Sequence, residues 1–233
     1  MITKKTKRIK NIFNKVSYKY DFLNNLLSLG LHNLWKKKLI DILDPVDGEQ
    51  WADLCCGTGD LAFRLNDLVF PNGSVLGVDI SKELLRIATS RSNNLNNKVI
   101  SWLEKDIFDL DNRRYKFDGI SMSYGLRNLN NVEDGINKIF FLLKENGRAG
   151  LLDFNHAPNK SFASLFQKIY LRFIVVPISS LFNLKKEYEY IENSIRNFPQ
   201  EKQLIQISKK IGFKEARYIN ILGGQMGLLI LEK

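Results

Sequence analysis

The stretch Trp51–Asp60, WADLCCGTGD, holds two adjacent cysteines and a Gly-Thr-Gly turn between two aspartates, Asp53 and Asp60. The apolar run QWADLC leads into the turn, and the amphipathic run LAFRLNDLV follows it. A β-rich run, a glycine turn and a helical run in this order predict a strand, a loop and a helix, with a loop backbone that can approach a ligand closely. The stretch therefore predicts the first unit of an α/β fold, with a binding loop at the carboxyl end of its strand.

The residues around the turn narrow the class of ligand. No Gly-Lys-Ser or Gly-Lys-Thr follows, which excludes a Walker A phosphate loop. The pattern G-x-G-x-x-A from Gly57, with Asp79 about 20 residues further on, matches a relaxed dinucleotide fingerprint. A pyrophosphate binds the positive end of a helix dipole, however, and neighbouring carboxylates such as Asp53 and Asp60 repel it. The two carboxylates favour a cationic ligand instead, such as an ammonium or a sulfonium group.

The alternation of β-rich and helical runs continues along the rest of the chain. Strands are expected at residues 50–55, 73–80, 99–106, 116–124 and 148–155, and helices at 61–69, 82–94, 132–147 and 200–212. Gly147 is expected to stop the third of these helices. Near the C-terminus two apolar runs flank Gly223 and Gly224, which indicates a hairpin and predicts an antiparallel strand at the edge of the sheet. The pattern predicts an α/β protein with a mostly parallel, seven-stranded sheet and an antiparallel C-terminal hairpin strand.

The net charge of +10 is concentrated at the N-terminus. Residues 1–40 hold one acid, Asp21, and ten basic residues: Lys4, Lys5, Lys7, Arg8, Lys10, Lys15, Lys19, Lys36, Lys37 and Lys38. Such an arm indicates an anionic partner, although a merely solvated face is the alternative. The two cysteines cannot form a disulfide framework, so we interpret them as packing residues in a reducing, cytoplasmic compartment. The sequence shows neither a signal peptide nor an apolar run long enough to span a bilayer.

Two segments lie outside the alternation. The first, residues 1–46, is expected to form a basic, amphipathic, helical arm or lid, because Ile9, Phe13, Val16 and Tyr20 recur at helical spacing. The second is an apolar helical insertion at about 160–199 within the domain that spans 47–233. Both can cover a site or face lipid, and plain packing on the core is the alternative.

S-adenosylmethionine carries a sulfonium, and the other strand ends supply the groups that it needs. Asp79, after the second strand, can accept hydrogen bonds from both ribose hydroxyls, with Ile80 against the adenine face. Asp106, after the third strand, can accept from the adenine amino group, with Ile107 or Phe108 beside it. The carboxyl ends of these strands meet at one edge of the sheet, although each aspartate alone is also a common helix cap. We predict a cofactor site without a metal, formed by Asp53, Gly57, Thr58, Gly59, Asp79, Ile80, Asp106, Ile107 and Ser123.

Several separated stretches carry a family resemblance: VSYKYDFLNNLLSLGLHNLWKK, DLCCGTGDLA, SYGLRN, LLDF and YIENSIRNFP. Across nearly its full length the chain resembles the quinone-biosynthesis C-methyltransferases that act on demethylmenaquinol, demethylphylloquinol and polyprenyl benzoquinols. The form DLCCGTGDLA, with FQKIY and VVP, is most similar to the phylloquinone branch. Many relatives have Ala-Gly in place of Cys55 and Cys56, a small aliphatic in place of Trp51, and Glu-Phe-Ser in place of Asp-Phe-Asn from Asp153. The resemblance implies a Rossmann-like, class I S-adenosylmethionine-dependent methyltransferase.

The chemistry that the resemblance implies is C-methylation of a reduced, prenylated naphthoquinone ring. Demethylphylloquinol is the expected substrate, and demethylmenaquinol or a polyprenyl benzoquinol is the alternative. The hydroxyls of the reduced ring push electron density onto the carbon that is methylated. The resemblance places Arg127 and Asn128 at the ring oxygens, with Tyr124 and His156 as candidates for proton transfer. Arg127 cannot act as a base at neutral pH, so its expected role is to stabilise an oxyanion or to orient a water.

Three other classes of protein share part of this pattern. An amino-directed nucleic-acid methyltransferase, including one for RNA, usually has Asn/Asp-Pro-Pro-aromatic after the fourth strand, where this chain has Ser-Tyr-Gly-Leu from Ser123. A nicotinamide oxidoreductase is disfavoured by Asp53 and Asp60, and a non-catalytic partner protein is the third alternative. The expected partners are a phytyl naphthohydroquinone and an anionic membrane surface, which the protein would contact peripherally, and not nucleic acid. A homodimer is the candidate oligomeric state.

Overall fold

The computed structural model describes residues 7, 9–12, 14, 28, 30–93, 99–155, 193–221, 224 and 226–233. Its seven strands form one sheet in the order β3-β2-β1-β4-β5-β7-β6. In chain order they are β1 (Gln50–Leu54), β2 (Ser74–Asp79), β3 (Ile100–Glu104), β4 (Phe117–Ser123), β5 (Leu143–Phe154), β6 (Glu215–Ile221) and β7 (Met226–Glu232). Neighbouring strands from β3 to β5 pair in parallel, and β7 pairs antiparallel with both β5 and β6. The predicted α/β fold and its antiparallel C-terminal strand are confirmed.

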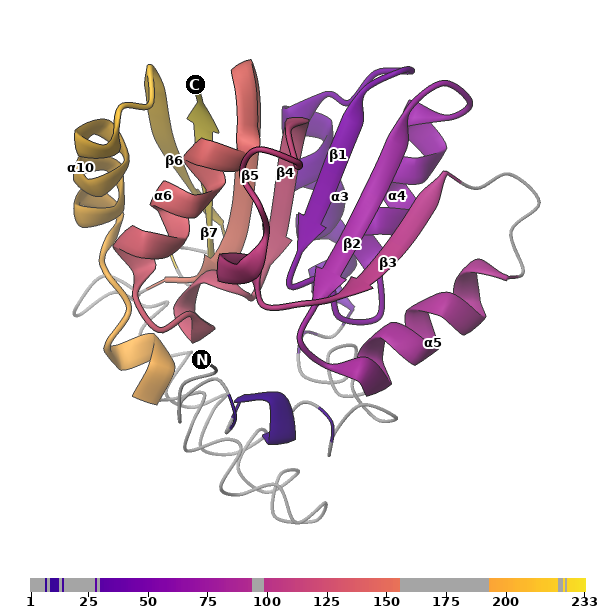
Figure 1. The fold of residues 1–233 in the computed structure, drawn as a ribbon. Helices are drawn as coiled ribbons and strands as arrows, with labels where there is room; N and C mark the ends of the chain where they lie inside the picture. Colours follow the sequence, from indigo (N-terminus) through magenta and orange to yellow (C-terminus); the bar gives the residue numbers. More distant parts are fainter. Residues whose placement is uncertain are drawn as a thin grey trace.

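Helices cover both faces of the sheet. They are α3 (Leu31–Leu43), α4 (Asp60–Val69), α5 (Lys82–Ser92), α6 (Val132–Leu142) and α10 (Glu201–Ile211), with short 3-10 helices η2 (Ile107–Asp109) and η3 (Leu126–Asn128). In Figure 1, α3 and α4 lie behind the sheet and α6 lies in front of it. The helices cover the faces of the sheet, and the carboxyl ends of the parallel strands lie along one edge of it. No helix among the described residues combines the length and the apolar character needed to cross a membrane.

The core has two halves because successive strand residues point to opposite faces. On one face Trp51, Leu228 and Ile230 pack with α3 and α4, and on the other Ala52 and Leu229 pack with α6 and α10. The indole of Trp51 has room because β4 has a glycine, Gly119, directly beside it. The alternation fixes which face of the sheet each helix covers.

Two local predictions were wrong. The helix expected over 132–147 ends at Leu142, because Leu143 is extended, fully buried and paired with Phe117 of β4. Residues up to Gly147 therefore belong to the start of β5. The antiparallel strand is also not at the edge of the sheet: β7 lies between β5 and β6. The residues of β7 from Met226 to Leu231 are buried on both faces of the sheet, as is typical of an interior strand. Strand β6 is only partly buried, which suits a strand at the edge.

The predicted division into an arm (1–46) and a domain with an insertion stays a prediction. Residues 160–192 of the insertion, and most of the arm before residue 30, lie outside the described residues. Helix α3, the last part of the predicted arm, contacts β5 and α4 and is part of the helical layer on the sheet.

Candidate active site

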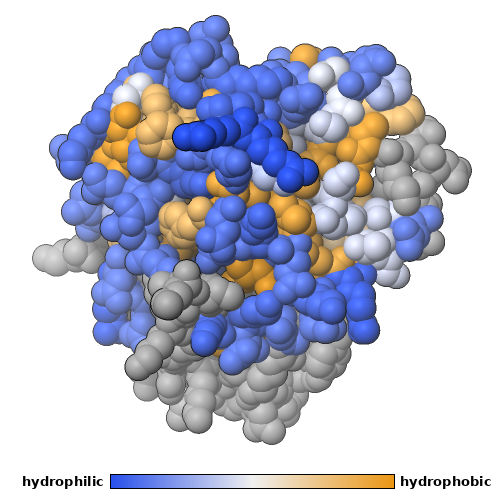
Figure 2. Space-filling view, in the orientation of Figure 1, coloured by the Kyte–Doolittle hydropathy of each residue, from blue (hydrophilic) through white to orange (hydrophobic). Residues whose placement is uncertain are grey.

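A cavity opens where the parallel strands end, as the residue pattern predicts. Six of the predicted cofactor residues line it: Gly57, Asp79, Ile80, Asp106, Ile107 and Ser123. Figure 2 shows hydrophobic residues gathered near the middle of the viewed face, within a mostly hydrophilic surface. The lining of the cavity itself combines apolar residues such as Ile80, Leu84 and Ile107 with a few polar groups, as small-molecule sites usually do.

The loop after β1 is held by its neighbours rather than by its own side chains. Cys55, Gly57 and Gly59 all have positive φ, at 56°, 57° and 91°. The backbone N–H of Gly57 donates to Asp79 Oδ2 at 2.9 Å, and the N–H of Cys56 donates to the Val78 carbonyl at 3.1 Å. The loop is thus tied to β2, the neighbouring strand.

Asp53 lies beneath this loop and does not line the cavity. It is 1% exposed and accepts hydrogen bonds from Ser121 Oγ at 2.8 Å and from the N–H of Ala62 at 3.1 Å. Burial raises the pKa of Asp53 to about 7, although the Ser121 hydrogen bond and the charge of Lys36 act in the opposite direction. The carboxyl therefore joins β1, β4 and the first turn of α4.

Asp60 is also outside the cavity wall, because two cations hold it elsewhere. Its oxygens are 2.7 Å from Lys36 Nζ and 2.8 Å from Arg91 Nη1. Burial alone would raise the pKa of Asp60, but the two ion pairs lower it to about 2. Asp53 and Asp60 were expected to face a cationic ligand, but both carboxyl groups contact residues of the protein and neither lines the cavity. Thr58 and Gly59 likewise do not line the cavity.

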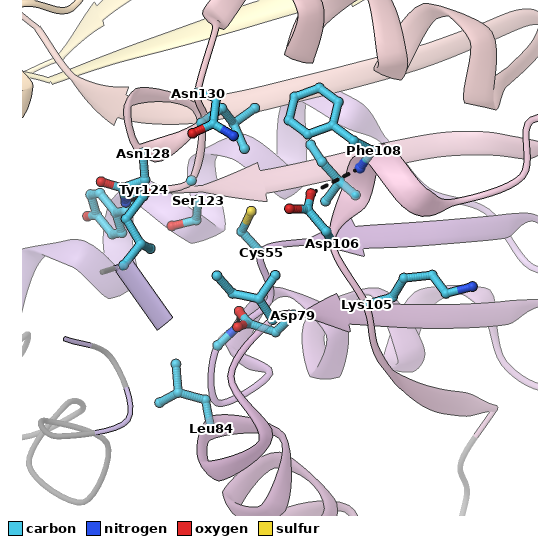
Figure 3. Close-up of a pocket in the computed structure, with 16 residues that line it drawn as sticks. Cys55, Asp79, Leu84, Lys105, Asp106, Phe108, Ser123, Tyr124, Asn128 and Asn130 are labelled. Atoms are coloured by element: carbon cyan, nitrogen blue, oxygen red, sulfur yellow. Dashed lines mark hydrogen bonds between the residues drawn. The ribbon is translucent and has the colours of Figure 1, made fainter. Parts of the chain in front are cut away.

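The two strand-end aspartates are placed as expected. Asp79 ends β2, is 8% exposed, and its Oδ1 accepts from the N–H of Ser81 at 2.8 Å. Asp106 Oδ1 accepts from the N–H of Phe108 at 3.1 Å, shown as a dashed line in Figure 3. Burial raises the pKa of Asp79, and backbone hydrogen bonds from Ser81, Gly57 and Ile80 oppose that rise. Both carboxyl groups are anchored by backbone donors and line one cavity.

The turn after β4 forms the opposite wall. Ser123 Oγ is buried and has no hydrogen-bond partner among the described residues. Tyr124, which also lines the cavity, has a positive φ of 60°, and its carbonyl accepts from Asn128 Nδ2 at 2.8 Å. In the view of Figure 3, Ser123 lies between Cys55 on one side and the pair Tyr124 and Asn128 on the other. An unpaired hydroxyl in a cavity wall is a group that a bound ligand can satisfy.

Arg127 lies behind this turn and does not line the cavity. Its Nη1 is 2.6 Å from Asp153 Oδ1 and donates to the Tyr124 carbonyl at 2.9 Å. The guanidinium carbon is 4.9 Å from the centre of the Phe154 ring, and Nε is buried without a hydrogen-bond partner in the described part of the chain. Of the three predicted catalytic residues, the structure thus places Tyr124 and Asn128 at the cavity and Arg127 in a buried ion pair.

Sequence reasoning missed several residues of the wall, among them Ile9, Leu84, Lys105 and Asn130. Asn130 follows SYGLRN directly, and Ile9 belongs to the helical spacing of the arm, so both carried a signal. The two cysteines are not activated nucleophiles: burial, with added repulsion from Asp79, raises the pKa of each thiol well above its usual value. His156, the other candidate for proton transfer, lies outside the described residues.

Solved structures with this arrangement share a fold class. The chain is similar to the magnesium protoporphyrin IX methyltransferase of Synechocystis with bound S-adenosylmethionine, at 14% identity and a TM-score of 0.68, covering 99% of this chain and 98% of that one. It is also similar to an S-adenosylmethionine-dependent methyltransferase of Aquifex aeolicus, at 15% identity and a TM-score of 0.59, covering 84% and 88%. The fold is that of the S-adenosylmethionine-dependent methyltransferases.

Sequence comparison identifies the family within that class. Residues 1–231 match the ubiE/COQ5 methyltransferase family. The 2-phytyl-1,4-naphthoquinone methyltransferase of Nostoc sp. is 40% identical over 229 residues, covering 98% of this chain and 100% of that protein. The chloroplastic 2-phytyl-1,4-beta-naphthoquinone methyltransferase of Arabidopsis thaliana is 37% identical over 222 residues, covering 94% and 85%. The chain belongs to the ubiE/COQ5 methyltransferase family and is an S-adenosylmethionine-dependent methyltransferase, as the sequence predicted.

Proposed function

We propose that this protein transfers a methyl group from S-adenosylmethionine to a ring carbon of demethylphylloquinol, giving phylloquinol. The observation that carries the proposal is the 40% identity, over the whole chain, to a 2-phytyl-1,4-naphthoquinone methyltransferase. A demethylmenaquinol or a polyprenyl benzoquinol remains the alternative substrate within the family. No feature of the cavity favours RNA, because its wall is largely apolar and its polar groups are mostly aspartates and amides.

The residues of the cavity fit the cofactor. Asp79 presents a buried carboxyl that can accept from the two ribose hydroxyls, while Ile80 offers an apolar surface to the adenine. Asp106 can accept from the adenine amino group beside Phe108. The Ser123 hydroxyl, unpaired in the described structure, has hydrogen-bonding capacity for a ligand. When bound, S-adenosylmethionine supplies a methyl group on a positively charged sulfur.

The β4 turn supplies the groups for the acceptor ring. Tyr124 and Asn128 line the cavity beyond Ser123, where ring hydroxyls of the quinol would enter. A ring hydroxyl loses its proton to give an oxyanion, which nearby donors stabilise and which pushes electrons onto the ring carbon as that carbon takes the methyl group. The hydrogen of the same carbon then leaves as a proton and the oxygen is reprotonated, which restores the aromatic quinol; the cofactor leaves as S-adenosylhomocysteine. Arg127 acts from behind, because it and Asn128 both donate to the Tyr124 carbonyl and so hold this turn. Its positive charge is paired with Asp153, so its part is to hold the turn rather than to act as a free charge at the ring.

The test is methyl transfer from labelled S-adenosylmethionine to chemically reduced 2-phytyl-1,4-naphthoquinone, followed by mass measurement of the quinone. The reduced ring should be methylated and the oxidised ring should not, because the oxidised ring is electrophilic. Parallel reactions with demethylmenaquinol, a polyprenyl benzoquinol and bulk RNA distinguish the alternatives. Transfer to one of these, with none to demethylphylloquinol, would contradict the proposed substrate.

A matched pair of variants tests the cofactor site. Asp79→Ala should weaken S-adenosylmethionine binding by roughly tenfold or more, since two ribose hydroxyls would lose their acceptor. Asp118→Asn is the control, because Asp118 binds the N–H of Gln50 and Lys144 at the opposite end of the sheet. Calorimetry should separate the two variants, and equal affinities would remove Asp79 from the site.

We also propose that the basic N-terminal arm binds an anionic membrane surface, where a phytyl substrate resides. Each basic residue near such a surface contributes about 1 kcal/mol, so several together give reversible, salt-sensitive attachment. Flotation with vesicles should rise with anionic lipid and fall when four residues of the arm are neutralised, namely Lys4, Lys5, Lys7 and Arg8. The control neutralises four exposed lysines of the C-terminal region: Lys202, Lys209, Lys210 and Lys214. A chain that stays unbound at low salt would contradict this role while leaving the methyltransferase proposal intact.

A further inference from the structure

One described residue of the N-terminal arm lines the cofactor cavity, and two others contact residues next to its wall. Ile9 is 6% exposed and lines the cavity itself. Lys10 Nζ lies 2.7 Å from Glu104 Oε1, and Asn14 Oδ1 accepts from Ser81 Oγ at 2.6 Å. In Figure 1 the described N-terminal residues lie at the lower edge of the view, near the start of α5. The arm therefore contacts the same edge of the sheet that carries the predicted ribose site.

Both polar contacts of the arm lead to Asp79. Glu104, the partner of Lys10, lies directly across from Asp79 in the register of β2 and β3. Ser81, the partner of Asn14, donates its backbone N–H to Asp79 Oδ1 at 2.8 Å. The arm thus contacts Ser81, which donates to the carboxyl group that is expected to bind the ribose, and Glu104, the neighbour of Asp79 on the next strand.

The charge of Lys10 also acts on Asp79 directly. Burial raises the pKa of Asp79, and Lys10 is a cation whose field lowers it. The backbone donors of Ser81, Gly57 and Ile80 act in the same direction as Lys10. A carboxylate that must accept two hydroxyl donors needs its ionised form, so a nearby cation supports that role.

Ile9 completes an apolar wall. It lines the cavity together with Ile80 and Leu84, which come from the end of β2 and the first turn of α5. Leu84 is itself oriented by the capping hydrogen bond from its N–H to Ser81 Oγ at 3.2 Å. One serine, Ser81, therefore links Asn14 of the arm to both the carboxyl and the apolar side of the cavity.

We propose that Ile9, Lys10 and Asn14 belong to the cofactor site of this enzyme. Ile9 forms part of the wall that contacts the bound adenosine moiety, and Lys10 and Asn14 are positioning residues that hold Asp79 through Glu104 and Ser81. The inference rests on the proposed function for the identity of the cofactor, but it does not depend on the quinol. It gives the N-terminal segment a role in cofactor binding that is separate from membrane attachment.

The test measures cofactor binding by the full-length protein with calorimetry, in the absence of lipid and quinol. Asn14→Ala should weaken S-adenosylhomocysteine binding about fivefold, as expected for one lost hydrogen bond. Ile9→Ala should weaken it about tenfold through the loss of buried apolar surface. The matched control is Asn33→Ala, because Asn33 is an exposed residue of α3 away from the cavity and should bind as wild type.

Charge variants separate positioning from mere folding. Lys10→Met should weaken binding about threefold, since its ion pair is partly exposed, and Glu104→Gln should have the same effect. Lys10→Arg should restore the affinity because it keeps the charge. Lys37→Met removes a comparable but remote pair with Asp41 and should change nothing. The quinol KM should stay unchanged in all of these variants.

The outcomes distinguish this inference from the proposed function. Weakened cofactor binding in Asn14→Ala and Lys10→Met, with rescue by Lys10→Arg, supports the inference even if the wild type methylates no quinol. Wild-type affinity in Ile9→Ala, Asn14→Ala and Lys10→Met would overturn it, even if demethylphylloquinol is methylated. A rise in the quinol KM at unchanged cofactor affinity would also overturn it, because the arm would then serve the substrate.

Discussion

Replacement of Asp53 by asparagine should make the stability of the protein less dependent on pH. The carboxyl is 1% exposed and lies between Ser121 Oγ and the N–H of Ala62. Asparagine has the same shape: its oxygen can accept from Ala62, and its amide can donate to the hydroxyl of Ser121. The substitution therefore removes the ionisable proton while keeping both hydrogen bonds.

The magnitude follows from the pKa of Asp53. Burial raises it from the ordinary value of 3.8 to about 7. A tenfold change in proton affinity corresponds to about 1.4 kcal/mol, so ionisation in the folded state is disfavoured by about 4 kcal/mol. Because the folded-state pKa is raised, the unfolded chain ionises first as pH rises, and the wild type loses stability between about pH 4 and 7. The stability of Asp53→Asn relative to wild type should improve by about 1.4 kcal/mol per pH unit in that window.

Urea unfolding of the two proteins at about pH 5, 6, 7 and 8 measures this difference. Asp118→Asn is the control. Partial burial opposes the shift, but Lys144 and the N–H of Gln50 lower the pKa of Asp118, so its titration is complete below this range. The Asp118→Asn difference should therefore be flat from pH 5 to 8. A flat difference for Asp53→Asn as well would refute the reasoning, because Asp53 would then ionise as an ordinary carboxyl group.

Three further substitutions or reactions test the packing around the site. Gly119→Ala places a methyl group well inside van der Waals contact with the Trp51 ring, so thermal unfolding should show a loss of about 1–3 kcal/mol, and an unchanged Tm would contradict the packing. Arg127→Met leaves Asp153 buried without its ion-pair partner and should lower the free energy of unfolding by about 3–5 kcal/mol in urea titrations. A loss below about 1 kcal/mol would mean that this pair contributes little. Iodoacetamide should alkylate Cys55 more slowly at about pH 8 than it alkylates free cysteine, because burial raises the pKa of the thiol; an equal rate would show that the thiol is accessible and ordinary.

The carboxyl ends of the strands could be predicted from the sequence because local patterns determine them. An apolar β-rich run followed by an aspartate predicted Asp79 and Asp106, and both line the cavity. Local patterns could not position β7, because its place between β5 and β6 depends on burial on both faces rather than on the hairpin alone. The helix end at Leu142 was missed for a similar reason: pairing of Leu143 with Phe117 overrides the helical spacing.

The contacts of Asp53, Asp60 and Arg127 could not be predicted for a different reason. The sequence shows charged residues near a glycine loop but not which cations reach them. Lys36 and Arg91, which bind Asp60, come from α3 and α5. Asp153, which binds Arg127, lies one residue before the end of β5. A charged residue that is close to a binding loop in the sequence can therefore stabilise the loop through an ion pair and need not contact the ligand.

The turn after β1 and the turn after β4 both line the cavity, and contact between them restricts which residues each turn can contain. Cys55 after β1 and Tyr124 after β4 both have a left-handed backbone conformation, on strands that pair directly. Because Leu54 pairs with Met122, the two turns follow within one residue of each other. A side chain at Gly125 would come within 2.7 Å of the Cys55 Cβ, which leaves room only for glycine there. The glycine of the second turn is thus required partly by the residue at position 55 in the first turn. Because the contact involves the Cβ of Cys55, any residue other than glycine at position 55 places the same restriction on position 125.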